Sequence, residues 1–272
     1  MTLQLSQSLA IAAAVGLLSG THTAIWGMYK DAAHEGFGVT RFARSIVVGM
    51  IAALLLQAVL ALPLPSPAAI VVLFGLAYAT ERGLVEVWKT FVRDEDQSKY
   101  FIPMQFSVGG VPVASRRARL AAGLGYVLSL AGCLTAIGWV DPNGALAPAL
   151  RAAIGGLALG VVVAIGGAWK DAPKEGFDAL KFIRSPLITV TYAVGLSLLT
   201  DSHLYAAVAA IGYERATAET YKTFFFPSKP RGKFNGKPVR HPHMLVCRRY
   251  FVPAYLAISV AALVCMLIAV GS

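Results

Sequence analysis

The chain has 272 residues, of which 57% are apolar and only 14% are charged, and its formal net charge at pH 7 is +10. Soluble domains carry about a quarter charged residues, so this composition excludes a soluble enzyme, a disordered tail and a disulfide-stapled secreted module. The three cysteines form no CxxC pair and therefore indicate neither a disulfide scaffold nor a zinc site. We expect an all-α integral membrane protein.

Long apolar runs divide the chain into eight predicted transmembrane helices, because a spanning helix needs about 20 mostly apolar residues. We interpret the first run as a span and not as a signal peptide, since it lacks a basic n-region. Prolines at 63, 65 and 67 separate the second span from the third. The predicted spans cover residues 1–29, 45–62, 68–90, 120–140, 152–169, 185–200, 202–225 and 251–270.

The sequence contains an internal repeat made of four blocks in the same order. The run KDAAHEGF at 30–37 recurs as KDAPKEGF at 170–177, and the pattern ERxxxEx[W/Y]KTF at 81–91 recurs at 214–224. An even number of spans per copy makes both copies enter the membrane from the same side. We therefore predict two parallel four-helix repeats, residues 1–140 and 141–272, with a pseudo-two-fold axis along the membrane normal.

The basic residues test this span assignment, since all Lys and Arg residues except Arg151 lie in or beside the loops after spans one, three, five and seven. The positive-inside rule places these loops in the cytoplasm and both termini on the opposite side. Cations that flank membrane helices indicate anionic membrane lipids, and not nucleic acid, as partners. We expect a protein of a bacterial inner (plasma) membrane, with a homo-oligomer or a larger membrane complex as open alternatives.

Two polar loops, 92–116 and 226–247, follow the third and seventh predicted spans. Each contains a hairpin-like stretch, at 106–113 and 234–239, and Asn235-Gly236 is a strong turn signal. These loops are either plain connectors or a pair of cytoplasmic flaps over an opening. Gly36 and Gly176 are expected to let the chain turn out of its span toward the interface.

The ERxxxE pattern carries charge into the membrane. Glu214 lies about 18 Å along its helix from Ser202 at ~1.5 Å per residue, which is about 10 Å short of the inner face of a ~30 Å hydrocarbon layer. Glu81 lies at a similar depth. Arg82 and Glu86 are i,i+4 neighbours that can pair along their helix. Charges at this depth are costly unless paired or hydrated, so they predict a functional site.

The candidate ligand-binding residues are the charged members of two repeated blocks. They are Glu81, Arg82, Glu86, Lys89, Glu214, Arg215, Glu219 and Lys222, together with Lys30, Asp31, Glu35, Arg44, Lys170, Asp171, Glu175 and Arg184. Arginine and lysine suit phosphate or carboxylate groups, and the carboxylates are suited to hold Mg²⁺ beside a phosphate or to carry protons. The alternative is a set of salt bridges that fixes helix packing.

Two kinds of histidine stand outside this set. His22 falls near the middle of the first span, where it is either a hydrogen-bonded packing residue or a proton or substrate contact. His241 and His243 lie in a loop and are too few to indicate a metal site. No pattern specifies a cofactor.

Three function classes remain. The leading hypothesis is a transporter or flippase for a small anionic or phosphate-bearing ligand, which includes lipids, bound by the charged cluster in the cytoplasmic half of the membrane. The second is a membrane enzyme that acts on a lipid phosphate at the inner interface. The third is a structural or assembly subunit, because small residues such as Gly155, Gly156 and Gly160 favour close helix contacts.

Overall fold

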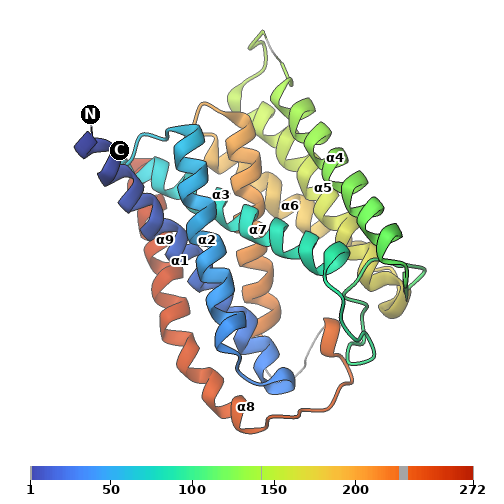
Figure 1. Ribbon diagram of the computed structural model, residues 1–272. Helices are drawn as coiled ribbons and strands as arrows, with labels where there is room; N and C mark the ends of the chain where they lie inside the picture. The colour runs from blue at the N-terminus through green and yellow to red at the C-terminus, as the bar shows by residue number, and fades with distance from the viewer. Residues whose placement is uncertain (1, 142, 227–231, 272) are drawn as a thin grey trace.

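The computed structural model describes residues 2–141, 143–226 and 232–271, which form an almost entirely helical bundle (Figure 1). The long helices are α1 (Thr2–Glu35), α2 (Val39–Leu60), α3 (Pro67–Val87), α4 (Arg116–Gly138), α5 (Pro148–Glu175), α6 (Ala179–Leu196), α7 (His203–Phe224) and α9 (Val252–Gly271). The short elements are the π-helical turn η1 (Trp88–Val92), the strands β1 (Ser107–Val108) and β2 (Val111–Pro112), the 3-10 turn η2 (Gly232–Phe234), the helix α8 (His243–Cys247) and the 3-10 turn η3 (Arg248–Phe251).

Within the described residues, six helices are long and apolar enough to cross a membrane. They comprise α1, α2, α3 continued by η1, α4, α5, and α8 continued through η3 into α9. This confirms an all-α chain and is consistent with a polytopic membrane protein. Helices α6 and α7 lie where the sixth and seventh spans are predicted but are not among the six. Helix α6 carries Lys and Arg in its first half, and α7 carries Glu, Arg and Lys in its second half.

Helix boundaries follow local signals that are visible in the sequence. Helix α2 ends at Leu60 and α3 begins at Pro67, where the Ser66 hydroxyl accepts a hydrogen bond from the Ala69 amide at 3.2 Å. Helices α1 and α5 end just before Gly36 and Gly176, whose φ angles of 74° and 81° lie in the left-handed region that glycine adopts without strain. The predicted turns at these glycines are confirmed.

Helix α1 continues six positions beyond the predicted end of the first span, from Tyr29 to Glu35. Its 34 residues make it about 51 Å long at ~1.5 Å per residue. A hydrocarbon layer is only ~30 Å thick. Helix α1 is therefore longer than such a layer is thick, and its last turns carry the start of the KDAAHEGF block.

The helices approach most closely at glycines. A Cβ atom built on Gly20 of α1 would lie 2.4 Å from the Ser45 carbonyl oxygen of α2, and one on Gly160 of α5 would lie 2.6 Å from Pro186 Cα of α6. At the crossing of α3 and α7, a Cβ on Gly212 would lie 2.2 Å from the carbonyl oxygen of Gly75. Small residues at these points allow backbone-to-backbone packing, as is common in membrane bundles.

The last helix of each predicted repeat contacts the opposite half of the chain. Helix α9 packs against α1 and α3, while α4 lies against η1 and against α5 and α7. Figure 1 shows α9, in red, beside the blue α1, and the green α4 beside α5. The start of α1 and the end of α9 lie at the same end of the bundle (Figure 1).

The two polar loops differ in structure. β1 and β2 pair antiparallel around Gly109 and Gly110, whose φ angles are positive, so the predicted hairpin at 106–113 is confirmed. The second hairpin prediction is wrong. Asn235-Gly236 does form a turn, but the described residues 232–241 contain a 3-10 turn and no strand. Pro238 has no N–H to donate to a strand ladder. Residues 227–231 of this predicted loop lie outside the described residues.

Candidate functional site

Two carboxylates of the ERxxxE pattern lie deep in the bundle. Glu81 of α3 and Glu214 of α7 are both 0% exposed, so neither faces the surface, as the sequence predicts. Each has one oxygen 3.6 Å from Nε of the arginine that follows it, Arg82 or Arg215. The Ser185 hydroxyl donates a hydrogen bond to Glu214 at 2.7 Å. Among the described residues, three of the four carboxylate oxygens have no hydrogen-bond partner.

Among the described residues, two ion pairs between long helices cross between the halves of the chain. Lys30 Nζ of α1 lies 3.6 Å from a carboxylate oxygen of Glu219 in α7, and Lys170 Nζ of α5 lies 2.7 Å from one of Glu86 in α3. Lys30 and Lys170 occupy the same place in the repeated KDA block, and Glu86 and Glu219 occupy the same place in the ERxxxE block. The two blocks that the sequence repeats are thus brought together, each in contact with the copy from the other half.

Contacts along the helices agree only in part with their predicted spacing. The two i,i+3 pairs have the same separation of 3.8 Å: Lys89–Glu86 and Lys222–Glu219. Arg82 also reaches Glu86 at 3.3 Å and lies over the ring of Trp26, 5.2 Å from its centroid. The corresponding contact between Arg215 and Glu219 does not form within 4 Å. Arg215 is also more exposed than Arg82.

The acids at the ends of α1 and α5 are neutralised by lysines that are not among the predicted site residues. Lys233 lies 2.7 Å from Asp31 and 3.7 Å from Glu35, and Lys181 lies 2.6 Å from Asp171 and 2.9 Å from Glu175. Lys181 belongs to a repeated block, so the sequence contains a signal for its role. Lys233 comes from a distant loop, and nothing in its local sequence indicates this role. In the described residues, no group of three or more His, Cys, Asp or Glu side chains is placed to hold a metal ion.

Arg44 of α2 and Arg184 of α6 differ from the other predicted site residues. Neither has a carboxylate within 4 Å in the part of the chain that the structure describes, and in both the Nε atom is buried without a hydrogen bond. Arg44 lies over the ring of Trp88, with its guanidinium carbon 5.5 Å from the centroid. A guanidinium that is partly buried without an anion is costly.

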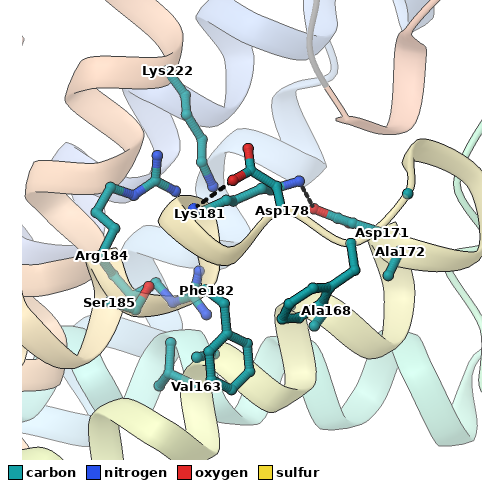
Figure 2. Close-up of a pocket in the computed structure, with 15 residues that line it drawn as sticks. Val163, Ala168, Asp171, Ala172, Asp178, Lys181, Phe182, Arg184, Ser185 and Lys222 are labelled. Atoms are coloured by element: carbon teal, nitrogen blue, oxygen red, sulfur yellow. Dashed lines mark hydrogen bonds and ion pairs between the residues drawn. The ribbon is translucent and has the colours of Figure 1, made fainter.

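Arg184 lines a hollow between α5, α6 and α7 that also contacts Lys181, Arg215 and Lys222. Figure 2 shows the Arg184 and Lys222 side chains approaching it from α6 and α7. Its free volume is about 50 Å³, which is roughly the space for three or four water molecules. The lining holds four cations and two acids, Asp171 and Asp178, so its formal charge is positive, and Arg184 is the cation among them without a carboxylate within 4 Å in the described residues.

The equivalent position in the first half is covered. The Phe251 ring of η3 lies 5.9 Å from the Phe37 ring and 6.0 Å from the Phe42 ring, centroid to centroid. In the second half Phe177 and Phe182 contact each other at 5.6 Å, and no third ring of the described residues joins them. Phe177 is therefore 66% exposed and Phe37 45%. Phe251 covers the Phe37–Phe42 pair of the first half, while the equivalent Phe177–Phe182 pair of the second half stays more open.

His22 lies in a hydrogen-bonded cluster that joins α1, α3 and α9. Its Nδ1 is 3.2 Å from the Tyr78 hydroxyl and its Nε2 is 3.1 Å from the Ser259 hydroxyl. Trp26 donates to the Tyr78 oxygen at 2.8 Å, and Ser259 donates to the Tyr255 carbonyl at 2.9 Å. The Trp26 N–H and the Ser259 O–H protons are thus already donated. We therefore assign the Tyr78 hydroxyl as donor to Nδ1 and the Nε2–H as donor to Ser259. His22 is thus a neutral, fully bonded ring, which favours its packing interpretation.

These features define a class: an all-helical bundle, compatible with a polytopic membrane protein, with a layer of ion pairs across its halves. No protein-family model, no curated protein and no solved structure matches the chain. A fold by itself does not specify an activity, so the function follows from the chemistry of the charged layer.

Proposed function

We propose that this protein is a membrane transporter or flippase for an anionic, phosphate-bearing ligand, with lipids included in that class. The observation that carries the proposal is an excess of positive charge in the layer. With the acids of the repeated KDA blocks and their partners Arg41, Lys181 and Lys233 included, eight carboxylates face eleven basic side chains. The carboxylates are Asp31, Glu35, Glu81, Glu86, Asp171, Glu175, Glu214 and Glu219, and the other bases are Lys30, Arg44, Arg82, Lys89, Lys170, Arg184, Arg215 and Lys222. A phosphate group supplies the missing negative charge, and arginine offers it two parallel donors.

The proposal includes the architecture predicted from the repeat: eight spans in two parallel four-helix units, a pseudo-two-fold axis along the membrane normal, and both termini outside the cytoplasm of a bacterial cell. Its support is the recurrence of the same geometry at equivalent positions. The Glu–Arg separations are 3.6 Å in both halves and the Glu–Lys separations are 3.8 Å in both. Transporters built from parallel repeats place their ligand site between the two units.

The difference between the halves also supports transport. One of the two equivalent positions is covered by Phe251, and the other is open at Arg184. We take these as two places that a ligand can occupy alternately within one chain. The competing structural-subunit hypothesis explains the glycine contacts and the ion pairs. It gives no role to Arg44 and Arg184, which have no acid partner in the described part of the chain.

The test uses the purified protein in liposomes that carry a fluorescent phosphatidic acid, phosphatidylglycerol or phosphatidylcholine. A membrane-impermeant quencher measures movement of each lipid between leaflets. We expect transport of the anionic lipids by the wild type and about a tenfold to hundredfold slower rate for Arg184→Gln, since a charge-assisted hydrogen bond contributes about 1.5–3 kcal/mol. Lys174→Gln, which removes an exposed cation, is the matched control.

A folded Arg184→Gln protein with the wild-type rate would overturn the ligand role of this arginine. Release of a cleaved lipid product during the assay would instead support the enzyme hypothesis. Absence of movement for all three lipids, together with wild-type stability of the variant, would support the structural subunit.

Orientation is tested separately by single cysteines in a variant that lacks Cys133, Cys247 and Cys265. A cysteine in place of Asn235 is expected to react with an impermeant maleimide only after the cytoplasmic face is opened. A cysteine in place of Ala145 is expected to react in intact cells. The reverse pattern would overturn the proposed orientation.

A further inference from the structure

A second hollow, separate from the one at Arg184, lies at the C-terminal end of α1. Its volume is about 380 Å³, and it is enclosed by α1, the start of α2, the loop between α3 and α4, and the described part of the loop between α7 and α8. Its charged and aromatic lining includes His34, Arg41, Lys99, Lys237, Arg240 and His241. Charged side chains and loop segments line it, so we place this hollow in the aqueous phase.

The two loops contact each other around this hollow. The Phe101 amide donates a hydrogen bond to the Lys233 carbonyl at 2.8 Å, and Lys237 donates to the Ser98 carbonyl at 2.9 Å. The Tyr100 and Phe234 rings lie 5.9 Å apart. This is the arrangement expected of two flaps that meet over one site, and it brings together residues more than 130 positions apart in the chain.

The acids that line this hollow already have cationic partners. Glu35 is in contact with Arg41 and lies 3.7 Å from Lys233. Glu95 is in contact with Lys99 and lies 2.5 Å from Arg93. Burial opposes ionisation of Glu95, but the Lys99 hydrogen bond and the Arg93 charge outweigh it and hold its pKa below the ordinary value. Both carboxylates are therefore paired with cations in place.

Among the described residues, two further cations of the hollow have no carboxylate within 4 Å. They are Lys237, which donates to the Ser98 carbonyl, and Arg240. His34 donates from Nδ1 to the Pro238 carbonyl at 3.1 Å, and the His241 ring lies against Gly36. The hollow therefore has a surplus of donors and positive charge.

We infer that this hollow binds a soluble, multiply charged phosphate compound on the cytoplasmic side. Its volume is at the lower end of the ~300–1,000 Å³ range of small-molecule sites, which fits a pyrophosphate group or a small organic phosphate. A ligand here contacts both loops and α1 together and fixes the loops over the end of α1. The cytoplasmic placement rests on the orientation proposed above, whereas the binding itself does not depend on the proposed transport function, because neither Lys237 nor Arg240 belongs to the charged layer.

The test measures binding of sodium pyrophosphate to the purified full-length protein by calorimetry and by the shift in melting temperature, with sulfate at matched ionic strength as the reference. We expect binding by the wild type and at least a tenfold loss of affinity for Lys237→Gln/Arg240→Gln. The melting temperature without ligand should be unchanged. Lys174→Gln, outside the hollow, and Arg184→Gln, in the charged layer, should both bind pyrophosphate as the wild type does.

No stabilisation beyond that given by sulfate, or equal affinity in the Lys237→Gln/Arg240→Gln variant, would overturn the inference. A parallel titration with vesicles of phosphatidylcholine containing phosphatidic acid separates the two sources of phosphate. If the double variant loses vesicle binding and pyrophosphate does not bind, the recognised group is a lipid headgroup, and the soluble-ligand inference is wrong.

Discussion

A methyl group added at Gly20 tests the packing of α1 on α2. The new Cβ would lie 2.4 Å from the Ser45 carbonyl oxygen and 2.7 Å from Ile46 Cα, where ordinary contacts begin at 3.4 Å. Both neighbours are backbone atoms, so no change of rotamer relieves the clash, and α2 must move away by about 1 Å. Overpacking of this kind costs about 1–3 kcal/mol. At about 2–4 °C per kcal/mol for a chain near this size, Gly20→Ala should lower the melting temperature by roughly 2–12 °C.

The same chain provides matched controls. Gly160→Ala should lower the melting temperature similarly, since its Cβ would lie 2.6 Å from Pro186 Cα. At Gly27 and Gly167 a Cβ meets no atom within 4 Å, so alanine there should leave stability unchanged or raise it by up to about 1 kcal/mol through helix propensity. Thermal unfolding in detergent, followed by circular dichroism, measures all four variants. A Gly20→Ala protein as stable as Gly27→Ala would refute the close contact between α1 and α2.

Three further predictions concern polar groups. His22→Ala should destabilise the protein by about 1–3 kcal/mol, because buried hydroxyl groups lose their partner; unchanged thermal unfolding would contradict the packing role. Glu86→Gln should be less stable than Lys170→Met, by only about 1 kcal/mol since the Glu86 side chain is 45% exposed, because it removes the carboxylate from Lys170, Arg82 and Lys89 together; the opposite order in a melting experiment would count against these pairs. The lowered pKa of Glu95 means that its stabilisation is present above the ordinary Glu value of about 4.3 and is lost as pH falls through the lower folded-state pKa. Amide exchange in residues 93–106, corrected for intrinsic rates, should then accelerate at acid pH in the wild type, and an equal acceleration in Glu95→Gln would exclude this cause.

Much of the fold is predictable because its signals are local. Apolar runs and the prolines at 63–67 locate the helices and the break between α2 and α3, since each depends only on neighbouring residues. Gly36 marks the end of α1 for the same reason. The burial of Glu81 is predictable because a carboxylate at that position of an apolar helix is costly when it faces lipid, and the side chain is 0% exposed.

The sequence was less informative where a signal depends on context. Asn235-Gly236 forms its turn, but a hairpin also needs flanking residues with free N–H groups, and Pro238 removes one. The sequence predicts the end of the first span at Tyr29 because the charged residues begin directly after it. A helix does not stop at a membrane surface, however, and α1 continues to Glu35 because its backbone hydrogen bonds need no lipid.

The tertiary structure alone decided which charges meet. Lys30 pairs with Glu219, and Lys233 reaches Asp31, only because packing of the helices and loops brings distant segments within 4 Å. Repetition in the sequence identifies equivalent residues but does not indicate whether a residue contacts its own half or the other. That choice depends on how α1, α3, α5 and α7 pack around their glycines. It also leaves Arg184 beside an open hollow, because a long-range contact such as that of Phe251 with Phe37 forms in one half only.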